Sequence, residues 1–158
     1  MPVITCDTRI QAPIDLCFDL ARDVGIHCET AADTRERAVP PGKTAGLLEL
    51  GDLVTFEATH FAVRWRLTAR IVEMERPHYF VDQMERGPFA FLRHAHEFSE
   101  IAGATLMRDV MEWRSRCGPA GACVDEMFLR HHLHRFLTAR GMRLKQIAEA
   151  RVTASPAP

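Results

Sequence analysis

The spacing of apolar positions changes twice along the chain, and each change predicts a different kind of element. Residues 2–10 are rich in β-branched side chains and alternate polar with apolar, which predicts a strand with one buried face. Pro13 suits the first turn of a helix, and the helical spacing after it predicts two short helices, one from Pro13 to Ala21 and one over 24–32. The chain is therefore expected to begin with one strand and two short helices.

Between Leu47 and Arg114 the pattern has a period of two, which predicts an antiparallel run of about six strands. We expect them near 47–50, 53–61, 64–74, 79–85, 90–100 and 104–114, after a loop or edge segment over 34–46. From about 123 to 149 the helical spacing returns and predicts one long amphipathic helix. Because this helix must bury its apolar side, the order predicts an α+β protein with the helix against one sheet face. We expect one domain over residues 1–150 and a disordered tail over 151–158.

Two hairpins of this sheet gather apolar and imidazole side chains on one face. With Ala102-Gly103 as a two-residue turn, His96 lies opposite Asp109. A second hairpin, with its turn at Ala62-Val63, places His60 opposite Trp65. The inward residues of both hairpins are Val54, Phe56, Ala58, His60, Trp65, Leu67, Ala69, Ile71, Leu92, His94, His96, Phe98, Met107, Asp109, Met111 and Trp113. Asp82 joins them if Phe80 and Met84 also face inward. Such a face is typical of a small-molecule cavity, and a plain packed core is the alternative.

Composition and charge exclude several classes of protein. The 158 residues contain 20 Lys and Arg against 21 Asp and Glu, and this balance excludes a generally basic nucleic-acid-binding domain. The N-terminus lacks a basic segment followed by an apolar one, and no apolar run approaches the roughly 18 residues that span a bilayer. We therefore expect a cytoplasmic protein without a membrane span, in which all the cysteines are reduced.

Polar residues of the inward face are candidates for chemistry. His94 and His96, two residues apart on one strand, could offer two metal ligands, and His60, Asp82 or Asp109 could complete a site. Without a fixed third ligand we expect them to be polar anchors of the cavity, with no metal and no cofactor. His96 opposite Asp109 is also the candidate catalytic pair, because a carboxylate can orient an imidazole for acid–base work.

The long C-terminal helix adds apolar and charged candidates. Leu133 and Phe136 belong to its apolar stripe and are expected to close the cavity. Arg140 falls inside the same stripe, where it is expected either to reach past the sheet edge or to meet an acid such as Asp82 or Asp109. The solvated face of the helix is expected to carry His131, His132 and His134.

Several short motifs carry a resemblance to a known superfamily. They are Ala12-Pro13 followed by Phe18, Gly51-Asp52, the segment Val54 to Phe61, Arg66-Leu67-Thr68, Gly87-Pro88-Phe89 and the segment Arg93 to Phe98. With these motifs, residues 3–149 resemble an uncharacterised bacterial subgroup of the START-like, or SRPBCC, superfamily, which includes polyketide cyclases. The resemblance implies the helix-grip fold, in which a curved antiparallel sheet of about seven strands wraps around the long C-terminal helix. It also implies a cavity between sheet and helix, and no insertion for the iron ligands of the ring-hydroxylase branch is seen.

The observations lead to one main hypothesis of function and two alternatives. The first is a ligand-binding protein that holds a hydrophobic small molecule, apolar, aromatic or lipid-like, in an internal cavity. Its expected binding residues are Phe56, His60, Trp65, Leu67, Asp82, His94, His96, Phe98, Met107, Met111, Trp113, Leu133, Phe136 and Arg140. The second is an enzyme of cyclase, aromatase or dehydratase type that uses His96 and Asp109, and the third is an interaction module that modulates a partner protein. As partners we expect a hydrophobic small molecule and no nucleic acid, while a homodimer stays open.

Overall fold

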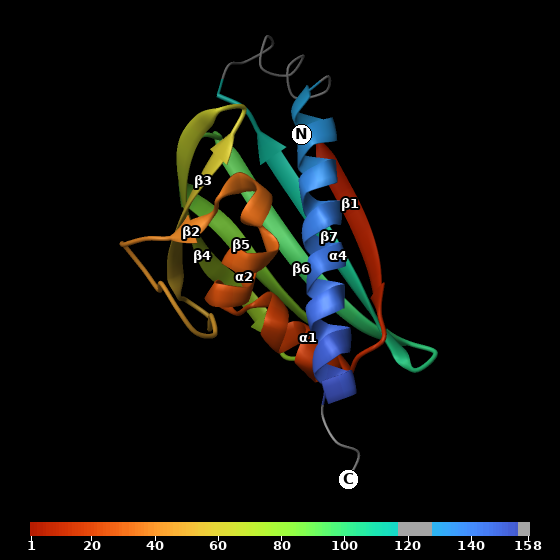
Figure 1. Ribbon diagram of the computed structural model, residues 1–158. Coiled ribbons are helices and arrows are strands. Elements are labelled where there is room, and N and C mark those ends of the chain that lie inside the picture. The colour runs from red at the N-terminus through yellow and green to blue at the C-terminus, as the bar shows by residue number, and fades with distance from the viewer. Residues whose placement is uncertain (117–127, 155–158) are drawn as a thin grey trace.

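The computed structural model describes residues 1–116 and 128–154, which form one curved antiparallel sheet with the helices on one of its faces (Figure 1). Its strands are β1 (Val3–Ile10), β2 (Arg37–Ala38), β3 (Leu53–His60), β4 (Val63–Glu75), β5 (Tyr79–Arg86), β6 (Phe91–Ile101) and β7 (Ala104–Arg114), in the order β1-β7-β6-β5-β4-β3-β2. The helices are α1 (Ile14–Ala21), α2 (Val24–Thr30), the 3₁₀ turn η1 (Ala32–Thr34) and α4 (Arg130–Ala154). The predicted α+β arrangement, a curved sheet around one long helix with short helices after the first strand, is confirmed.

One predicted strand is absent from the described chain. Residues 47–50 do not form a strand, because Leu47 makes only a single bridge and Leu48 turns into the core. Gly46 and Gly51, with φ of +79° and +87°, bend the chain on both sides and leave too short an extended stretch between them. The edge strand of the sheet is instead β2, which lies in the segment expected to be a loop or edge.

The long helix extends further than predicted. It runs to Ala154, so residues 151–154 are helical rather than part of a disordered tail. Near this end the Thr153 hydroxyl donates to the Glu149 carbonyl at 2.9 Å. The predicted start of the helix near 123 and the residues 155–158 lie outside the described chain.

The β6–β7 hairpin has the predicted register. Its turn residues Ala102 and Gly103 have φ of +47° and +74°, the left-handed conformation that a two-residue hairpin turn of this kind requires. His96 is therefore paired with Asp109, and His94 lies two residues along on the same face. This hairpin sets the positions of the polar groups described below.

The β3–β4 hairpin differs from its prediction by two residues. Its turn is Phe61-Ala62 and not Ala62-Val63, so Trp65 is paired with Ala58 instead of its predicted partner. Because side chains alternate along a strand, a shift of two residues keeps each of them on the predicted face. Neither turn residue is Gly or Asn, the types that usually mark such a turn, so the sequence does not reveal its position.

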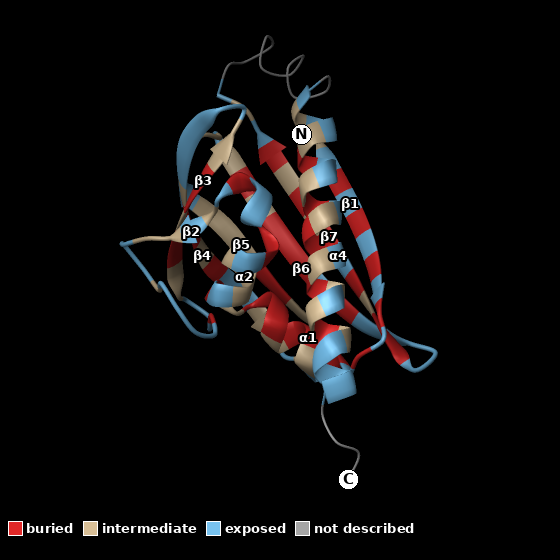
Figure 2. Ribbon diagram, in the orientation of Figure 1, coloured by how far each residue is buried: buried red, intermediate tan, exposed pale blue. Residues whose placement is uncertain are grey.

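Two buried clusters hold the sheet and helices together (Figure 2). One lies between α1, the sheet and the C-terminal part of α4, and it includes Phe18, Phe80, Phe98, Met107 and Leu144. The other lies between β1, β7 and the first turns of α4, and it includes Met111, Trp113, Leu133 and Leu137. Phe98, Met107 and Trp113 are thus packed core residues, which corrects the prediction that they line a cavity.

The described residues also bear on the cysteines and on membrane insertion. Cys6, Cys17 and Cys28 are free thiols, whereas Cys117 and Cys123 lie outside the described chain. No helix within the described ranges has the length and apolarity needed to cross a bilayer.

Candidate functional site

A cavity of about 390 Å³ lies between the inner face of the sheet and the helices α2 and α4. Most of its wall is apolar and includes Val54, Phe56, Ala58, Leu67, Ile71, Phe80, Phe89, Leu92, Met111, Leu133 and Phe136. Phe61 and Trp65 also belong to the wall and are 60% and 41% exposed, so the wall reaches solvent at the tip of the β3–β4 hairpin. The sheet and the long helix therefore do not pack solidly over this region.

Most of the predicted binding residues meet at this cavity. Its wall includes Phe56, His60, Trp65, Leu67, Asp82, His94, His96, Met111, Leu133, Phe136 and Arg140. The other predicted binding residues, Phe98, Met107 and Trp113, lie in the packed core. Asp109 is not part of the wall either, because it lies on β7 behind the imidazoles of His94 and His96.

Sequence reasoning misses several residues of the wall. Four of them come from turns, from α2 and from the segment before β2, and they are Phe61, Phe89, His27 and Glu36. His132 was expected on the solvated face of the long helix, but its ring lines the cavity and bonds His60. Helical spacing places His132 only about 100° from the buried Leu133, which is the signal that could have found it.

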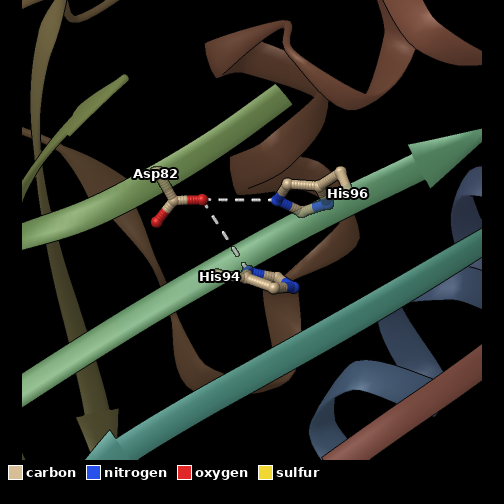
Figure 3. A group of neighbouring side chains, drawn as sticks. All are labelled: Asp82, His94 and His96. Atoms are coloured by element: carbon tan, nitrogen blue, oxygen red, sulfur yellow. Dashed lines mark ion pairs between the residues drawn. The ribbon is translucent and has the colours of Figure 1, made fainter. Parts of the chain in front are cut away.

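Two histidines and two aspartates form a buried cluster where β5, β6 and β7 run side by side. Figure 3 shows three of them, Asp82, His94 and His96. His94 Nε2 lies 3.0 Å from Asp109 Oδ1 and donates to it, because an ionised carboxylate only accepts. His96 Nδ1 lies 2.7 Å from the same oxygen but off the line of a hydrogen bond, so this contact is mainly electrostatic. On the other side, Asp82 Oδ2 lies 3.8 Å from His94 Nδ1 and 3.3 Å from His96 Nε2. The two imidazoles thus lie between two carboxylates.

Burial and the carboxylates act in opposite directions on these groups. Burial, together with the charge of His96, lowers the pKa of His94 to about 4, although Asp109 acts to raise it. Burial also disfavours a charged His96, but Asp109 and Asp82 outweigh burial and raise the pKa of His96 above its usual value. Burial disfavours an ionised Asp109, yet the two histidines hold the pKa of this carboxyl well below its usual range. At neutral pH His94 is therefore neutral, and its single N–H is used on Asp109.

Three residues of the cluster present atoms that could bind a metal ion. Asp82, His94 and His96 each offer one ligand atom, and these atoms all lie within 4.8 Å of one another. Asp82, the third ligand that the sequence left open, joins the histidines because β5 pairs it with His94. Ring contacts hold the imidazoles in place. The ring centroids of His94 and His96 lie 3.9 Å apart, and Phe80 stacks on His96 with ring centroids 4.3 Å apart.

Arg140 places a buried cation on the helix side of the cavity. Arg140 is 6% exposed, and its guanidinium takes part in none of the ion pairs or side-chain hydrogen bonds among the described residues. It meets neither Asp82 nor Asp109, which corrects that expectation. Glu36, another acid of the wall, is bonded to His27 Nε2 at 2.6 Å. The cavity therefore contains a positive charge without a direct partner among the described residues.

A pair of histidines joins the β3–β4 hairpin to α4 beside the exposed part of the wall. His60 Nδ1 and His132 Nε2 lie 2.8 Å apart, so one ring donates to the other. The exposed Phe61 packs against His132 with ring centroids 4.3 Å apart, and Phe136 meets His60 edge-on at 5.5 Å. Burial lowers the pKa of both histidines, which keeps both rings neutral at pH 7.

Solved structures of known proteins have a fold similar to that of this chain. No family model and no curated protein matches the sequence. Among solved structures, the Zhui aromatase/cyclase from Streptomyces sp. R1128 is similar with a TM-score of 0.78 and 16% identity, and the match covers 99% of each chain. A START superfamily protein from Mycobacterium smegmatis has a TM-score of 0.69 and 8% identity, and the match covers 92% of this chain and 98% of that one. A major latex-like protein from Panax ginseng has a TM-score of 0.70 and 10% identity, with 93% and 97% covered.

Proposed function

Because the chain has the START-like helix-grip fold, we propose that it binds a small molecule with an apolar or aromatic body and an acidic head group. The volume of the cavity, about 390 Å³, lies within the range of pockets that hold small molecules. Its mostly apolar wall suits the body of such a ligand, and the guanidinium of Arg140 suits the head group. The proposal thus narrows the hydrophobic ligand expected from the sequence to an amphipathic acid.

The guanidinium of Arg140, which forms no ion pair or side-chain hydrogen bond with any of the described residues, is the observation that carries this proposal. Burying a charge without a partner is costly, so a buried cation on a cavity wall favours an anion in that cavity. The acids around it are already engaged, since Glu36 bonds His27, and Asp82 and Asp109 contact the histidines of the cluster. A carboxylate on the ligand could form two parallel hydrogen bonds with the guanidinium, which is the strongest pairing that arginine makes.

The wall also favours a flat body for the ligand. His27 stacks on Phe56 with ring centroids 4.0 Å apart and planes 13° apart. Phe80 stacks on His96 in the same way, with planes 22° apart. Rings that are held by such contacts keep their orientation, and an aromatic ligand gains an offset or edge-on contact with them without reordering the wall.

A matched pair of probes tests the proposal. We expect 2-naphthoic acid to bind at least about tenfold more tightly than 2-naphthamide, which has the same ring system without the charge; tenfold corresponds to about 1.4 kcal/mol. Both affinities are measured by isothermal titration calorimetry at pH 7.5 on the wild-type chain and on Arg140→Gln. The preference for the acid should disappear in Arg140→Gln.

The control is Arg135→Gln, which removes an exposed arginine from the same helix and should keep the preference for the acid. Equal affinities of acid and amide for the wild-type chain would contradict the acidic head group but leave a binding cavity in place. If neither probe binds at millimolar concentration, the cavity does not hold flat aromatic molecules, and the binding function itself is overturned.

A further inference from the structure

We propose that Asp82, His94 and His96 form a binding site for one divalent transition-metal ion, of which Zn²⁺ is the representative, on the wall of the cavity. The proposal does not depend on what the cavity binds, because it concerns the chain and the metal alone. Two imidazoles and one carboxylate are a ligand set that divalent transition metals use widely in proteins. Here the three side chains come from β5 and β6, which hold them at a fixed register.

His94 and Asp82 direct two potential ligand atoms at each other. His94 donates from Nε2 to Asp109 and directs its other ring nitrogen, Nδ1, at Asp82. Asp82 Oδ2 lies 3.8 Å from that nitrogen, and Figure 3 shows the two atoms pointing toward each other. At 3.8 Å the two atoms are too far apart for a direct hydrogen bond, and a metal ion between them could be bound by both.

The position of Asp109 also suits a metal site. It lies behind both imidazoles, 3.0 Å from His94 Nε2 and 2.7 Å from His96 Nδ1, on the side away from the three ligand atoms. Histidines that bind metals nearly always direct their other ring nitrogen at a carboxylate or carbonyl, which fixes the tautomer and makes the ligand more basic. Asp109 accepts the hydrogen bond of His94 and lies beside Nδ1 of His96, and the other two ring nitrogens, His94 Nδ1 and His96 Nε2, face Asp82.

The two aspartates also bear on the charge of the cluster. Asp82 and Asp109 place two carboxylates in a cluster whose side chains are 3–20% exposed. Among the described residues, no lysine or arginine forms an ion pair with either aspartate. Buried carboxylates must be paired or coordinate a metal, and an ion bound by Asp82 and the two imidazoles would supply positive charge beside them.

The distances are close to those of a zinc site. Ligand atoms that bind Zn²⁺ tetrahedrally at about 2.0–2.1 Å lie roughly 3.3–3.4 Å from one another. Asp82 Oδ2 lies 3.3 Å from His96 Nε2 and 3.8 Å from His94 Nδ1, and the ligand atoms of the three residues all lie within 4.8 Å of one another, so small side-chain rotations would bring them to these separations. Because all three residues line the cavity, the metal would keep an open position toward it.

The test uses full-length protein without a histidine tag, stripped of metal with a chelator and dialysed. We expect Zn²⁺ to bind with a stoichiometry of one and micromolar or better affinity, measured by calorimetry and by metal analysis after gel filtration. Co²⁺ should give visible absorption bands typical of four or five ligands, and Zn²⁺ should abolish them by displacement. A stoichiometry near zero in the wild-type chain would overturn the proposal.

Variants locate the ion within the chain. Asp82→Asn and His94→Gln should each weaken Zn²⁺ binding at least 100-fold, whereas Asp109→Asn should keep the stoichiometry and weaken binding about 10- to 100-fold. His131→Gln combined with His134→Gln removes two exposed imidazoles from α4 and should change nothing. Circular dichroism shows which variants are folded, and Asp82→Asn alone decides the question if His94→Gln is not. Zn²⁺ binding that survives Asp82→Asn but is lost in His132→Gln would place the metal at the His60–His132 pair and overturn the proposal.

Discussion

Single residues on the inner face of the sheet divide into wall and core, and Trp113 shows where the boundary falls. Its side chain is fully buried among apolar residues, and its Nε1 atom has no hydrogen-bond partner among the described residues. An unpaired buried donor costs about 1–3 kcal/mol. The indole is therefore retained for its volume, and its polar group works against stability.

We expect Trp113→Phe to lower the free energy of unfolding by no more than about 1.5 kcal/mol, because the lost volume is offset by removal of the unpaired N–H. Trp113→Ala should cost about 3–5 kcal/mol, as large-to-small changes in a packed core do. Urea unfolding followed by circular dichroism measures both. If the Phe variant loses as much as the Ala variant, Nε1 has a partner and the argument fails.

Residue-level inference from the sequence succeeds where a turn sets the register and fails where the path of a segment is unknown. The Ala102-Gly103 turn was enough to place His96 beside Asp109. Asp82 could be named as a conditional neighbour, because strand alternation fixes faces but not the order of strands. His27 and Glu36 could not be found, since they reach the cavity from a short helix and an irregular segment. That Arg140 has no direct partner among the described residues likewise depends on its neighbours in space, which spacing along the helix does not reveal.

Among the elements, the contact between α4 and β1 depends on a glycine. A Cβ atom at Gly141 would lie 2.5 Å from Thr8 Oγ1, a distance that real Cβ contacts do not reach. Glycine is a poor helix former, so its presence in the middle of α4 needs a packing reason, and the close approach to β1 supplies one. This contact helps set how far the helix lies from the sheet.

Gly141→Ala should therefore destabilise the protein by about 1–3 kcal/mol through overpacking, although alanine is the better helix former by about 1 kcal/mol. Combining it with Thr8→Ala removes the hydroxyl that the new methyl group meets. We expect Gly141→Ala to cost clearly less in the Thr8→Ala background than in the wild type, by chemical denaturation of all four chains. Equal costs in the two backgrounds would show that the Thr8 hydroxyl does not limit the approach of the helix.

A second contact between elements depends on pH. His60 and His132 join the β3–β4 hairpin to α4 only while one ring can accept a hydrogen bond from the other. The pKa of each is lowered, first by burial; Glu36 faces His60, while Arg135 and His131 add positive charge near His132. A histidine whose pKa is lower in the folded protein than in the unfolded chain contributes stability that is present at neutral pH. This stability is lost as the pH falls below about 6.5.

We expect the backbone amides of residues 58–66 to exchange faster at pH 5.5 than at pH 7.5, after correction for the intrinsic rates. Protonation of both rings removes the acceptor and places two positive charges side by side. Hydrogen exchange followed by mass spectrometry measures this. His132→Gln should exchange faster at pH 7.5 and respond less to acidification. Unchanged protection of the wild-type hairpin between the two pH values would show that the histidine pair does not hold it.

At the scale of the whole molecule, the sequence predicts the sheet and helix layers but not whether a cavity lies between them. The alternation of the strands and the stripe of the long helix place the sheet and α4 face to face, as found (Figure 1). Whether such faces enclose a cavity depends on the distance at which they are held. Small contacts such as that of Gly141 with Thr8 set this distance, and the pattern of apolar residues does not encode them. The same pattern gives packed core at Phe98 and cavity wall at Phe56.

A buried charge kept for ligand binding lowers the stability of the ligand-free protein. A comparison of two buried arginines, one paired within the protein and one not paired among the described residues, measures this effect. Arg22 and Arg140 are each 6% exposed. Arg22 pairs with Asp19 at 2.8 Å and with Glu49 at 2.6 Å, and it donates to the Leu48 carbonyl at 2.9 Å. Arg140 has no such partner among the described residues. The stabilisation that an acidic ligand gives to the folded protein should therefore depend on Arg140 and not on Arg22.

In the absence of ligand, Arg22→Met should lower the free energy of unfolding by about 1–3 kcal/mol, because it breaks hydrogen bonds to a charged group. Arg140→Met should leave it unchanged or raise it, because it removes a buried charge and keeps the apolar stem. At a ligand concentration 100 times the dissociation constant, 2-naphthoic acid should stabilise the wild-type chain by about 2.7 kcal/mol and Arg140→Met by much less. Urea unfolding of the three chains with and without the acid measures these differences. If Arg140→Met destabilises the ligand-free chain as strongly as Arg22→Met, the guanidinium is already paired within the protein, and an acidic ligand is not what the cavity requires.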